Sequence, residues 1–333
     1  MKKLLIYGAA GYTGSMAAEY AASIGLSLVL AGRPQSRHAL DELAKRLDAE
    51  VRIFSLDDSE GIENGLANIH VLLNAAGPFA NTAQPLMRAA IRARVHYLDF
   101  SAELDTYRQA LDLDETARAS GAMLLPGSGG SVAMLGSLAG HALATVEKPQ
   151  KISIAIDVAG AMSRGSASSA RQSMLTRTLH LVDGELVERN PKEMRDFNFG
   201  NGPQASFPVT LPDLLTIFHA SGVANIETFV HVTAGALPTG DNHNGSAGPR
   251  IEELAANRYH AAVEVGDEEG GITRCVLDTV NGYTFTSMAA AEAARRVIAG
   301  EFRPGFQTPA GLFGYQFAET IADTRITDHL RSE

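Results

Sequence analysis

The sequence contains a single cysteine, Cys275, among its 333 residues. One cysteine cannot build an internal disulfide framework or a zinc site made of several cysteines. We therefore expect a reducing compartment and predict a cytoplasmic protein. The ten histidines show no His-x-x-x-His or comparable ligand spacing, so the sequence predicts no metal site.

Long apolar runs and clusters of basic residues are also missing. Gly8 and Gly11 interrupt the apolar start of the chain, and no stretch of about 20 apolar residues follows, so no integral membrane segment is predicted. Acidic residues outnumber basic ones, 38 to 28, which gives a formal charge of −10. This balance argues against nucleic acid and anionic lipid as partners. With 45% hydrophobic and 20% charged residues, the chain is globular, and its length suggests two domains.

Short apolar runs alternate with helix-like segments over the first 130 residues. The expected strands are Leu4–Tyr7, Leu26–Leu30, Val51–Leu56, Val71–Ala75, His96–Phe100 and Ala122–Leu125. The expected helices between them are Thr13–Ile24, Ala39–Leu47, Gln84–Arg94 and Leu104–Ser120. Such alternation is typical of right-handed βαβ crossovers. It predicts an α/β fold, a doubly wound Rossmann domain with a parallel sheet.

The pattern changes after a further helix near Val132–Thr145. Strands are expected at Lys151–Val158, Glu227–Thr233, Arg258–Val265 and Ile272–Val280, with a hairpin at Leu179–Val187 that turns at Asp-Gly. The helical spacing over Ser287–Ala299 then predicts a return to the first domain. We expect residues 1–130 and about 283–333 to form the Rossmann domain. Residues 131–282 would form an inserted α+β domain with a largely antiparallel sheet, for substrate binding and dimerisation.

Three glycines separate the first strand from the first helix. Gly8 allows a tight turn, Gly11 lets a pyrophosphate approach the backbone, and Gly14 lets helix and strand pack closely. The exposed N–H groups and the helix dipole favour a bound anion. The alternative interpretation is a purely structural turn with incidental glycines.

Arg33 follows the second strand, where an NAD-binding site usually has Asp or Glu to bind the ribose 2′-hydroxyl. Its guanidinium suits a 2′-phosphate, and Ser36 and Arg37 lie close enough in sequence to add contacts. Arg33 as an ordinary surface residue is the alternative. The pattern favours NADP as cofactor. At the end of the fourth strand, Asn74-Ala75-Ala76-Gly77-Pro78-Phe79 offers small residues over which a cofactor can lie, or an ordinary turn.

Candidate proton-handling groups follow the fifth strand. Asp99 and Glu103 are acid/base candidates if burial raises the pKa, and helix capping is the alternative for this segment. We expect His96, in the same strand, to be a packed and hydrogen-bonded residue. Gly127-Ser128-Gly129-Gly130-Ser131 is expected at the crossover between domains, with a cofactor or substrate contact as the alternative. Arg164, Arg171 and Arg177 are candidate substrate anchors or surface charges.

Several motifs together resemble the saccharopine dehydrogenase-like oxidoreductases. They are the glycine loop Gly8–Gly14, Ala31-Gly32-Arg33, the Asn74–Phe79 segment, His96–Glu103, Leu125-Pro126-Gly127 and Phe302–Pro309. The resemblance covers residues 1 to about 130, thins in the middle and resumes near residue 282. It implies an NADP-binding Rossmann domain in which Gly8, Gly11, Gly14 and Arg33, with Tyr12, Thr13 and Ala75 of the same motifs, bind the nucleotide. It further places Asn74, Gly77 and Pro78 beside the cofactor, and Ser101–Glu103 at the nicotinamide or substrate.

The loop ending Gly-Tyr-Thr-Gly also resembles N-acetylglutamyl-phosphate reductases, which need a nucleophilic cysteine. Cys275 lies in a strand-like run rather than at a helix start, so that family is set aside. The sequence thus predicts an NADP-dependent oxidoreductase that transfers hydride between NADPH and an imine, carbonyl or activated alkene of a small-molecule substrate. A non-catalytic NADP-sensing protein is the alternative, and a domain without cofactor is a third interpretation. A homodimer is expected by family analogy.

Overall fold

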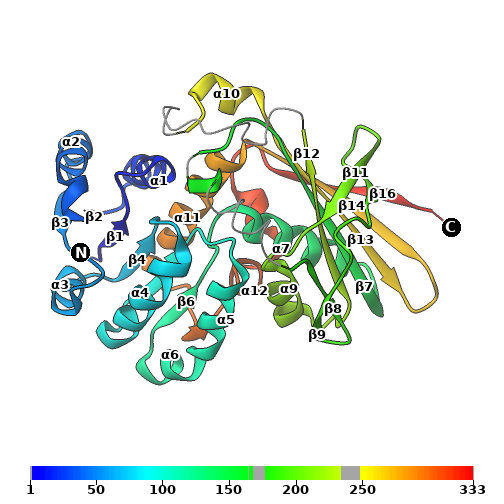
Figure 1. Cartoon of the computed structure of the whole chain (residues 1–333), viewed down its shortest axis with the longest axis horizontal. Coiled ribbons are helices and arrows are strands. Elements are labelled where there is room, and N and C mark those ends of the chain that lie inside the picture. Colours follow the sequence, from blue (N-terminus) through cyan, green and yellow to red (C-terminus); the bar gives the residue numbers. More distant parts are fainter. Residues whose placement is uncertain (1, 164, 168–176, 234–247, 333) are drawn as a thin grey trace. The chain divides into compact units, whose positions relative to one another are not determined.

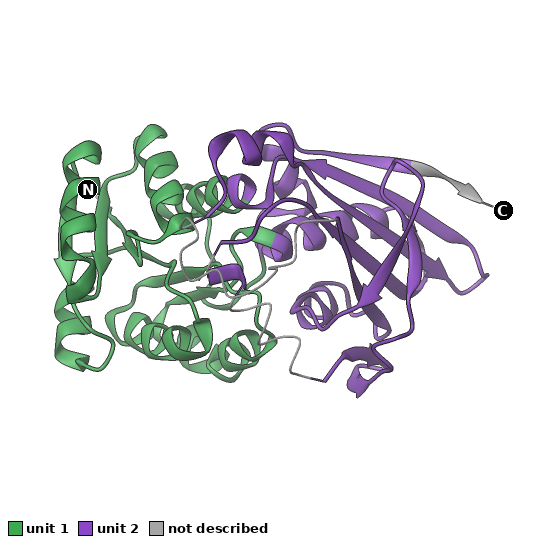
Figure 2. Cartoon of the chain, turned by 45° about the horizontal axis from the view of Figure 1, so that its top comes forward, with its two compact units in different colours: residues 1–130, 286–308 green, residues 131–285, 309–333 purple. Residues whose placement is uncertain are grey.

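The computed structural model describes residues 2–163, 165–167, 177–233 and 248–332 (Figure 1). The chain divides into two compact units (Figure 2). Unit 1 contains residues 1–130 and 286–308, and unit 2 contains residues 131–285 and 309–333. The three boundaries fall at the start of helix α7 (Gly130–Leu143), within helix α11 (Gly282–Ala299) and just before helix α12 (Pro309–Phe313). Candidate residues Arg164 and Arg171 lie outside the described residues. The glycine-, asparagine- and serine-rich composition of Thr239–Arg250 predicts a long loop, and most of it also lies outside them.

Unit 1 is built on a seven-stranded parallel sheet in the described part of the chain. The strand order is β15-β6-β5-β4-β1-β2-β3, which contains the 3-2-1-4-5-6 order of a Rossmann fold. The strands are β1 (Leu4–Tyr7), β2 (Leu28–Gly32), β3 (Glu50–Ile53), β4 (Val71–Asn74), β5 (His96–Asp99), β6 (Met123–Leu125) and β15 (Gly305–Phe306). Every residue of β1, β2, β4, β5 and β6 is buried, as both faces of a parallel sheet require. The predicted doubly wound domain is therefore confirmed.

The helices of unit 1 connect these parallel strands. They are α1 (Tyr12–Ser23), η1 (Pro34–Ser36), α2 (Arg37–Leu47), α3 (Ser59–Gly65), α4 (Phe79–Ala93), α5 (Leu104–Asp112), α6 (Asp114–Ser120) and most of α11 (Gly282–Ala299). Small residues of α1, such as Ala17 and Ala21, are buried, and they let the helix lie close to the sheet. In α3, the Asp58 side chain accepts a hydrogen bond from the Gly61 N–H and so caps the helix.

Unit 2 contains a nine-stranded mixed sheet among its described residues. The main path is β10-β11-β12-β7-β13-β14-β16, and β8 joins β12 and β9. The strands are β7 (Pro149–Val158), β8 (Leu179–Val182), β9 (Glu185–Glu188), β10 (Arg195–Asn198), β11 (Pro203–Pro208), β12 (Ile226–Val232), β13 (Tyr259–Asp267), β14 (Ile272–Thr279) and β16 (Arg325–Ser332). Only the β12–β7 pair is parallel among the described pairs, so the sheet is largely antiparallel as predicted.

The described helices of unit 2 include two long ones and several short ones. They are α7 (Gly130–Leu143), α9 (Asp213–Ser221), α10 (Ile251–Ala256), α12 (Pro309–Phe313) and η2 (Tyr315–Thr320). The Asp-Gly hairpin is confirmed, since β8 and β9 pair and both Asp183 and Gly184 have positive φ. The C-terminal segment differs from the expectation that placed it with the Rossmann domain. Residues 309–333 belong to unit 2, because β16 pairs antiparallel with β14.

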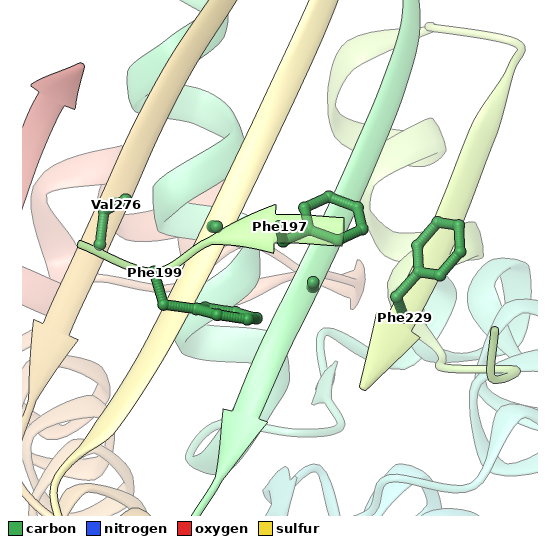
Figure 3. Close-up of a cluster of buried hydrophobic side chains, with 6 residues drawn as sticks. Phe197, Phe199, Phe229 and Val276 are labelled. Carbon is green, nitrogen blue, oxygen red and sulfur yellow. The ribbon is translucent and has the colours of Figure 1, made fainter. Parts of the chain in front are cut away.

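One face of the unit 2 sheet carries a cluster of aromatic side chains. Phe197, Phe199, Phe229 and Val276 gather there with Ala155 and Ala262, all nearly buried (Figure 3). Charged residues on neighbouring positions of the same face contact the cluster. The guanidinium of Arg189 lies 5.0 Å from the Phe229 ring centroid, and that of Arg195 lies 5.3 Å from the Phe197 ring centroid. This face therefore combines apolar packing with cation–π contacts.

Several elements begin or end away from their predicted positions. The predicted Leu104–Ser120 helix is two helices that meet at Leu113, and the helix predicted from Gln84 begins at Phe79. The sequence also failed to predict α3, α9, β10 and β11. Proline stands at both ends of β11, and three of the four residues of β10 are polar, so neither strand shows the alternation on which strand prediction relies. In the part of the chain that the structure describes, no helix combines the length and apolarity needed to cross a bilayer.

Candidate functional site

The glycine loop occupies the turn between β1 and α1. Gly8 has φ +87°, and a Cβ there would lie 2.8 Å from the Ala76 nitrogen. A Cβ on Gly14 would lie 2.4 Å from the Gly8 carbonyl oxygen, and one on Gly11 would lie 3.2 Å from the same atom. The tight turn and the close packing expected of Gly8 and Gly14 are therefore present. Gly11 is the N-cap of α1 and supplies no capping side chain, as its residue type dictates.

This loop lies against the segment that follows β4. The Ala75 N–H donates to the Tyr7 carbonyl at 2.8 Å, and Gly8 meets Ala75 and Ala76 in close contact. Strands β1 and β4 are the neighbours at which the strand order reverses. In open α/β sheets, ligands bind outside the carboxyl ends of the strands at such a switch point. The structure thus brings the glycine loop together with the Asn74–Phe79 segment at the position where a dinucleotide site is expected.

Arg33 follows β2 at the same carboxyl edge of the sheet. It is exposed, and no ion pair or hydrogen bond involves its side chain among the described residues. The positive charge of Arg33 also acts on Tyr7, the last residue of the neighbouring strand β1. Burial raises the pKa of Tyr7, and the positive charge of Arg33 partly opposes this. A guanidinium in this position is available to an anionic ligand.

Buried polar side chains at the carboxyl ends of β4 and β5 form a continuous chain of hydrogen bonds. Asn74 Nδ2 donates to the Tyr97 hydroxyl at 3.1 Å and to Thr82 Oγ1 at 3.1 Å. Asn74 Oδ1 accepts from the Ala76 N–H, and Thr82 donates to the Ala76 carbonyl. The Tyr97 hydroxyl donates to Asp99 Oδ2 at 2.8 Å. Asn74 therefore fixes the loop after β4 and couples it to β5.

Asp99 is completely buried and joins the loops that follow β5 and β6. Its Oδ1 accepts from the Ser101 N–H at 2.9 Å and from the Gly127 N–H at 2.7 Å. Its carbonyl accepts from the Ser128 N–H and hydroxyl. Burial raises the pKa of Asp99 to about 7, against the opposing effect of these N–H donors and of the Tyr97 hydroxyl. A buried carboxyl with three donors is suited to holding loops in place.

Ser101 and Glu103 lie between β5 and α5. The Ser101 hydroxyl donates to Glu103 Oε2 at 2.8 Å, and the Ala102 N–H donates to the same oxygen at 3.1 Å. Glu103 is the N-cap residue of α5, yet its carboxylate does not cap the helix. The Ser101 carbonyl accepts from the Tyr107 hydroxyl at 2.7 Å. Asp99 is buried and Glu103 is half-buried, so Glu103 is the more accessible of the two candidate acids.

His96 is a packed side chain, as predicted. Its Nδ1 accepts from the Met123 N–H at 3.2 Å, and its ring lies 4.2 Å from the Phe302 ring centroid. Burial, with smaller effects of His70 and Lys2, lowers the pKa of His96 to about 4. The ring is therefore neutral at physiological pH and serves to join β5, β6 and the segment before β15.

The remaining candidates lie elsewhere. Arg177 is exposed, and its guanidinium pairs with Glu188 at 3.3 Å, a surface ion pair. Cys275 is buried in β14, and burial raises the pKa of its thiol to about 12, which disfavours the nucleophilic thiolate. The sequence did not single out Tyr97, Thr82 or Gly127 as parts of the network. Tyr97 and Asp99 lie two residues apart on β5, so their side chains project from the same face of the sheet. This spacing is a local signal that could have linked them.

Comparison with known proteins supports the same assignment of unit 1. Residues 4–125 match the saccharopine dehydrogenase NADP-binding domain family. The chain carries an NADP-binding domain of the saccharopine dehydrogenase type. That segment includes the glycine loop, Arg33 and the side chains of Asn74, Tyr97 and Asp99. The predicted resemblance is therefore confirmed for residues 4–125, and the predicted cofactor, NADP, is confirmed with it.

Curated relatives match over the same domain. A trans-acting enoyl reductase of Mycobacterium tuberculosis (strain H37Rv) is 30% identical over 115 residues, which cover 33% of this chain and 28% of the relative. A lipid droplet localized protein of Caenorhabditis elegans is 26% identical over 111 residues, which cover 30% of this chain and 26% of that protein. The matched segment thus spans less than a third of the length of either relative.

A solved structure resembles the whole chain. Saccharopine dehydrogenase (L-Glu forming) from Saccharomyces cerevisiae aligns with a TM-score of 0.69 and covers 99% of this chain and 100% of its own. The sequence identity is 11%. At that identity the likeness establishes the fold, including an α/β domain combined with a second, mixed-sheet domain.

Proposed function

We propose that this protein is an NADP-dependent oxidoreductase that transfers hydride between NADPH and a C=N, C=O or activated C=C bond of a small molecule. One observation carries the proposal. At the switch point between β1 and β4, a glycine loop too crowded for side chains adjoins an uncapped helix start, and the exposed Arg33 lies on the next strand end. This combination fits a diphosphate and a 2′-phosphate.

The residues of unit 1 supply distinct parts of the proposed nucleotide site. Gly8, Gly11 and Gly14, with the backbone at Tyr12 and Thr13, would bind the diphosphate at the start of α1. Arg33 would bind the 2′-phosphate. The segment containing Asn74, Ala75, Gly77 and Pro78, together with Ser101, would line the nicotinamide half. When bound, NADPH supplies the hydride, and the protein's task is to orient the reacting groups and exclude water.

Proton handling is assigned to Glu103 within this proposal. Its Oε2 already receives a hydrogen bond from the Ser101 hydroxyl, which provides a route for a proton between the two side chains. Asp99, predicted from sequence as a second acid, has both carboxylate oxygens engaged by buried donors. We therefore propose Asp99 as a positioning residue that holds the Ser101 and Gly127 backbones.

The alternative of a non-catalytic NADP sensor has one observation in its favour. The most strongly perturbed acid at the strand ends, Asp99, is occupied with structural hydrogen bonds rather than exposed to a substrate. Turnover distinguishes the two proposals. An oxidoreductase consumes NADPH when offered imines, ketones or enoyl thioesters, and Glu103→Gln lowers kcat while leaving NADPH affinity unchanged. A sensor binds NADPH tightly and consumes none with any substrate class.

Paired glycine substitutions test the nucleotide site itself. Gly8→Ala places a Cβ against the β4 loop, so NADPH affinity should fall more than about tenfold, or about 1.4 kcal/mol. Gly25→Ala is the matched control, because Gly25 has φ +81° with no atom within 4 Å of the added Cβ. It should cost about 1 kcal/mol of folding stability and leave NADPH affinity unchanged. Equal affinities for the two variants would contradict the proposed site.

The homodimer and the cytoplasmic location rest on the resemblance and composition alone and stay predictions. Light scattering of the purified chain across a concentration series checks the first. Microscopy of the tagged full-length protein in its own cells checks the second.

A further inference from the structure

Three potential metal ligands from distant parts of the chain meet in unit 2. They are His141 in the last turn of α7, Cys275 in β14 and Asp328 in β16. His141 Nε2 lies 2.9 Å from Asp328 Oδ1, and Cys275 Sγ lies 3.3 Å from the same oxygen. The three donor atoms all lie within 4.8 Å of one another. No described residue elsewhere contributes to a comparable group of His, Cys, Asp and Glu.

The fold holds these ligands in place. Cys275 and Asp328 are directly opposite residues of the antiparallel β14–β16 pair, so their side chains project from the same face of the sheet. His141 reaches them from α7, whose own position is tied to the C-terminal segment by the hydrogen bond from the Ala318 N–H to Ser137 Oγ. The arrangement is therefore set by secondary-structure pairing rather than by a loop.

The order of the three groups argues against nucleophilic catalysis. In a Cys–His–Asp relay the imidazole stands between the thiol and the carboxylate. Here Asp328 Oδ1 stands between the thiol and the imidazole, so the imidazole is not placed to take the thiol proton. Three donors converging on one point are instead the arrangement of a chelate.

We propose that His141, Cys275 and Asp328 form a zinc-binding site with one coordination position left for water or another donor. Thiolate, imidazole and carboxylate are all zinc ligands, and their bond lengths of about 2.0–2.3 Å place tetrahedral ligands at separations similar to those observed. Asp328 is 68% exposed and His141 is 25% exposed, while Cys275 is buried, so the ion can enter from the solvent side. Binding replaces the thiol proton, which is released to solvent.

Metal titration of the chelator-treated full chain tests this site. Zinc should bind with one-to-one stoichiometry and raise the melting temperature, because it binds the folded state. Cobalt should give a thiolate-to-cobalt charge-transfer band. Cys275→Ser should abolish that band and weaken zinc binding beyond the roughly 10–100-fold lost with an outer-shell partner. Wild-type affinity in Cys275→Ser, or cobalt binding without the band, would overturn the proposal.

A second variant keeps the zinc site testable if Cys275→Ser does not fold. Asp328→Asn alters an exposed side chain, so the fold should persist while zinc affinity falls at least about tenfold. Asp105→Asn and His38→Asn are the matched controls, since both residues are exposed in unit 1 and should leave zinc affinity unchanged. Equal loss of affinity in Asp328→Asn and in the controls would identify adventitious surface binding and contradict the site. NADPH affinity should be the same in all four variants.

Discussion

Among the described residues, each unit has one aspartate with no exposed surface, and the two aspartates have opposite surroundings. Asp99 in unit 1 and Asp213 in unit 2 are both 0% exposed, and burial raises the pKa of each to about 7. Asp99 accepts hydrogen bonds from two backbone N–H groups and the Tyr97 hydroxyl. Neither carboxyl oxygen of Asp213 has a hydrogen-bond partner among the described residues, and nor has the nearby Thr216 hydroxyl.

The comparison shows that a perturbed pKa does not identify the role of a buried carboxyl. At Asp213, the first residue of α9, desolvation raises the pKa, with a smaller opposing effect of its own backbone N–H and none from neighbouring side chains. At Asp99 the same pKa accompanies a network that holds three strand ends together. The contacts of the oxygens, rather than the pKa, therefore decide which aspartate positions the candidate site.

Alanine substitution should separate the two aspartates most strongly. Asp99→Ala removes the acceptor from three buried donors, each costing about 1–3 kcal/mol when left unsatisfied, so unfolding free energy should fall by about 3–5 kcal/mol. Asp213→Ala breaks no described hydrogen bond and relieves a desolvated carboxyl, so the change should stay within about 1 kcal/mol. Urea unfolding measures both. A large loss of unfolding free energy in Asp213→Ala would show that the Asp213 carboxyl has a stabilising partner. It would contradict the difference proposed between the two aspartates.

Glu227 extends the comparison to a buried carboxylate of unit 2 that does have partners. Lys151, Arg189 and Arg195 lie within 3.0–3.5 Å of its oxygens, and its side chain is 12% exposed. Glu227→Gln removes one of the two charge partners of Arg189, itself 9% exposed, and leaves it the exposed Glu193, so we expect a loss of at most about 3 kcal/mol of unfolding free energy. Glu188→Gln, which changes an exposed surface pair, should have almost no effect on unfolding.

The pH dependence of the Glu227 effect has a defined sign. Burial opposes its ionisation, but Lys151, Arg189 and Ser153 outweigh this and hold the pKa below its ordinary value. The stabilisation is therefore present above the ordinary glutamate pKa and is lost as the pH falls through the lower folded-state pKa. The stability difference between wild type and Glu227→Gln should shrink in that acidic range. A difference that is constant with pH would contradict the ion-pair explanation.

Asparagine substitution tests the shared pKa through the slope of unfolding free energy against pH. A folded-state pKa of about 7, against 3.8 ordinarily, means that the folded state binds more protons between these values. Unfolding free energy should therefore fall as pH rises through this window, by up to about 1.4 kcal/mol per pH unit for each carboxyl. In Asp99→Asn and in Asp213→Asn, the unfolding free energy should fall less steeply as the pH rises. His96 contributes an opposite slope, which is common to wild type and variants and cancels in the difference.

Much of unit 1 could be predicted because its signals are local. The run Leu4–Tyr7, the glycines that follow and Arg33 lie within one βαβ unit, and buried parallel strands read as continuous apolar stretches. In unit 2, β10 and β11 lacked such a signal, because Phe197 and Phe207 stand among polar residues and prolines. Their pairing depends on tertiary packing over the sheet (Figure 3).

The side-chain networks depended on contacts that sequence spacing does not encode. Asp99 meets the Gly127 N–H across 28 residues, and His141 meets Asp328 across 187. The sequence predicted no metal site because it shows no local ligand motif, and the three residues of the proposed zinc site lie on three different elements. Residue type therefore predicted which side chains are candidates for ionisation or binding, and the fold determined which of them lie in contact.

The central claim is that the backbone loop of unit 1 binds the diphosphate and Arg33 selects the 2′-phosphate. Parallel titrations of NADPH and NADH into wild type, Arg33→Ala and Arg88→Ala test it directly, with Arg88 as an exposed arginine of the same unit. Arg33→Ala should weaken NADPH by about 10- to 100-fold, or about 1.4–2.7 kcal/mol, and leave NADH and the Arg88→Ala control nearly unchanged. Equal weakening of both nucleotides, or no binding of either by the wild type, would contradict the account.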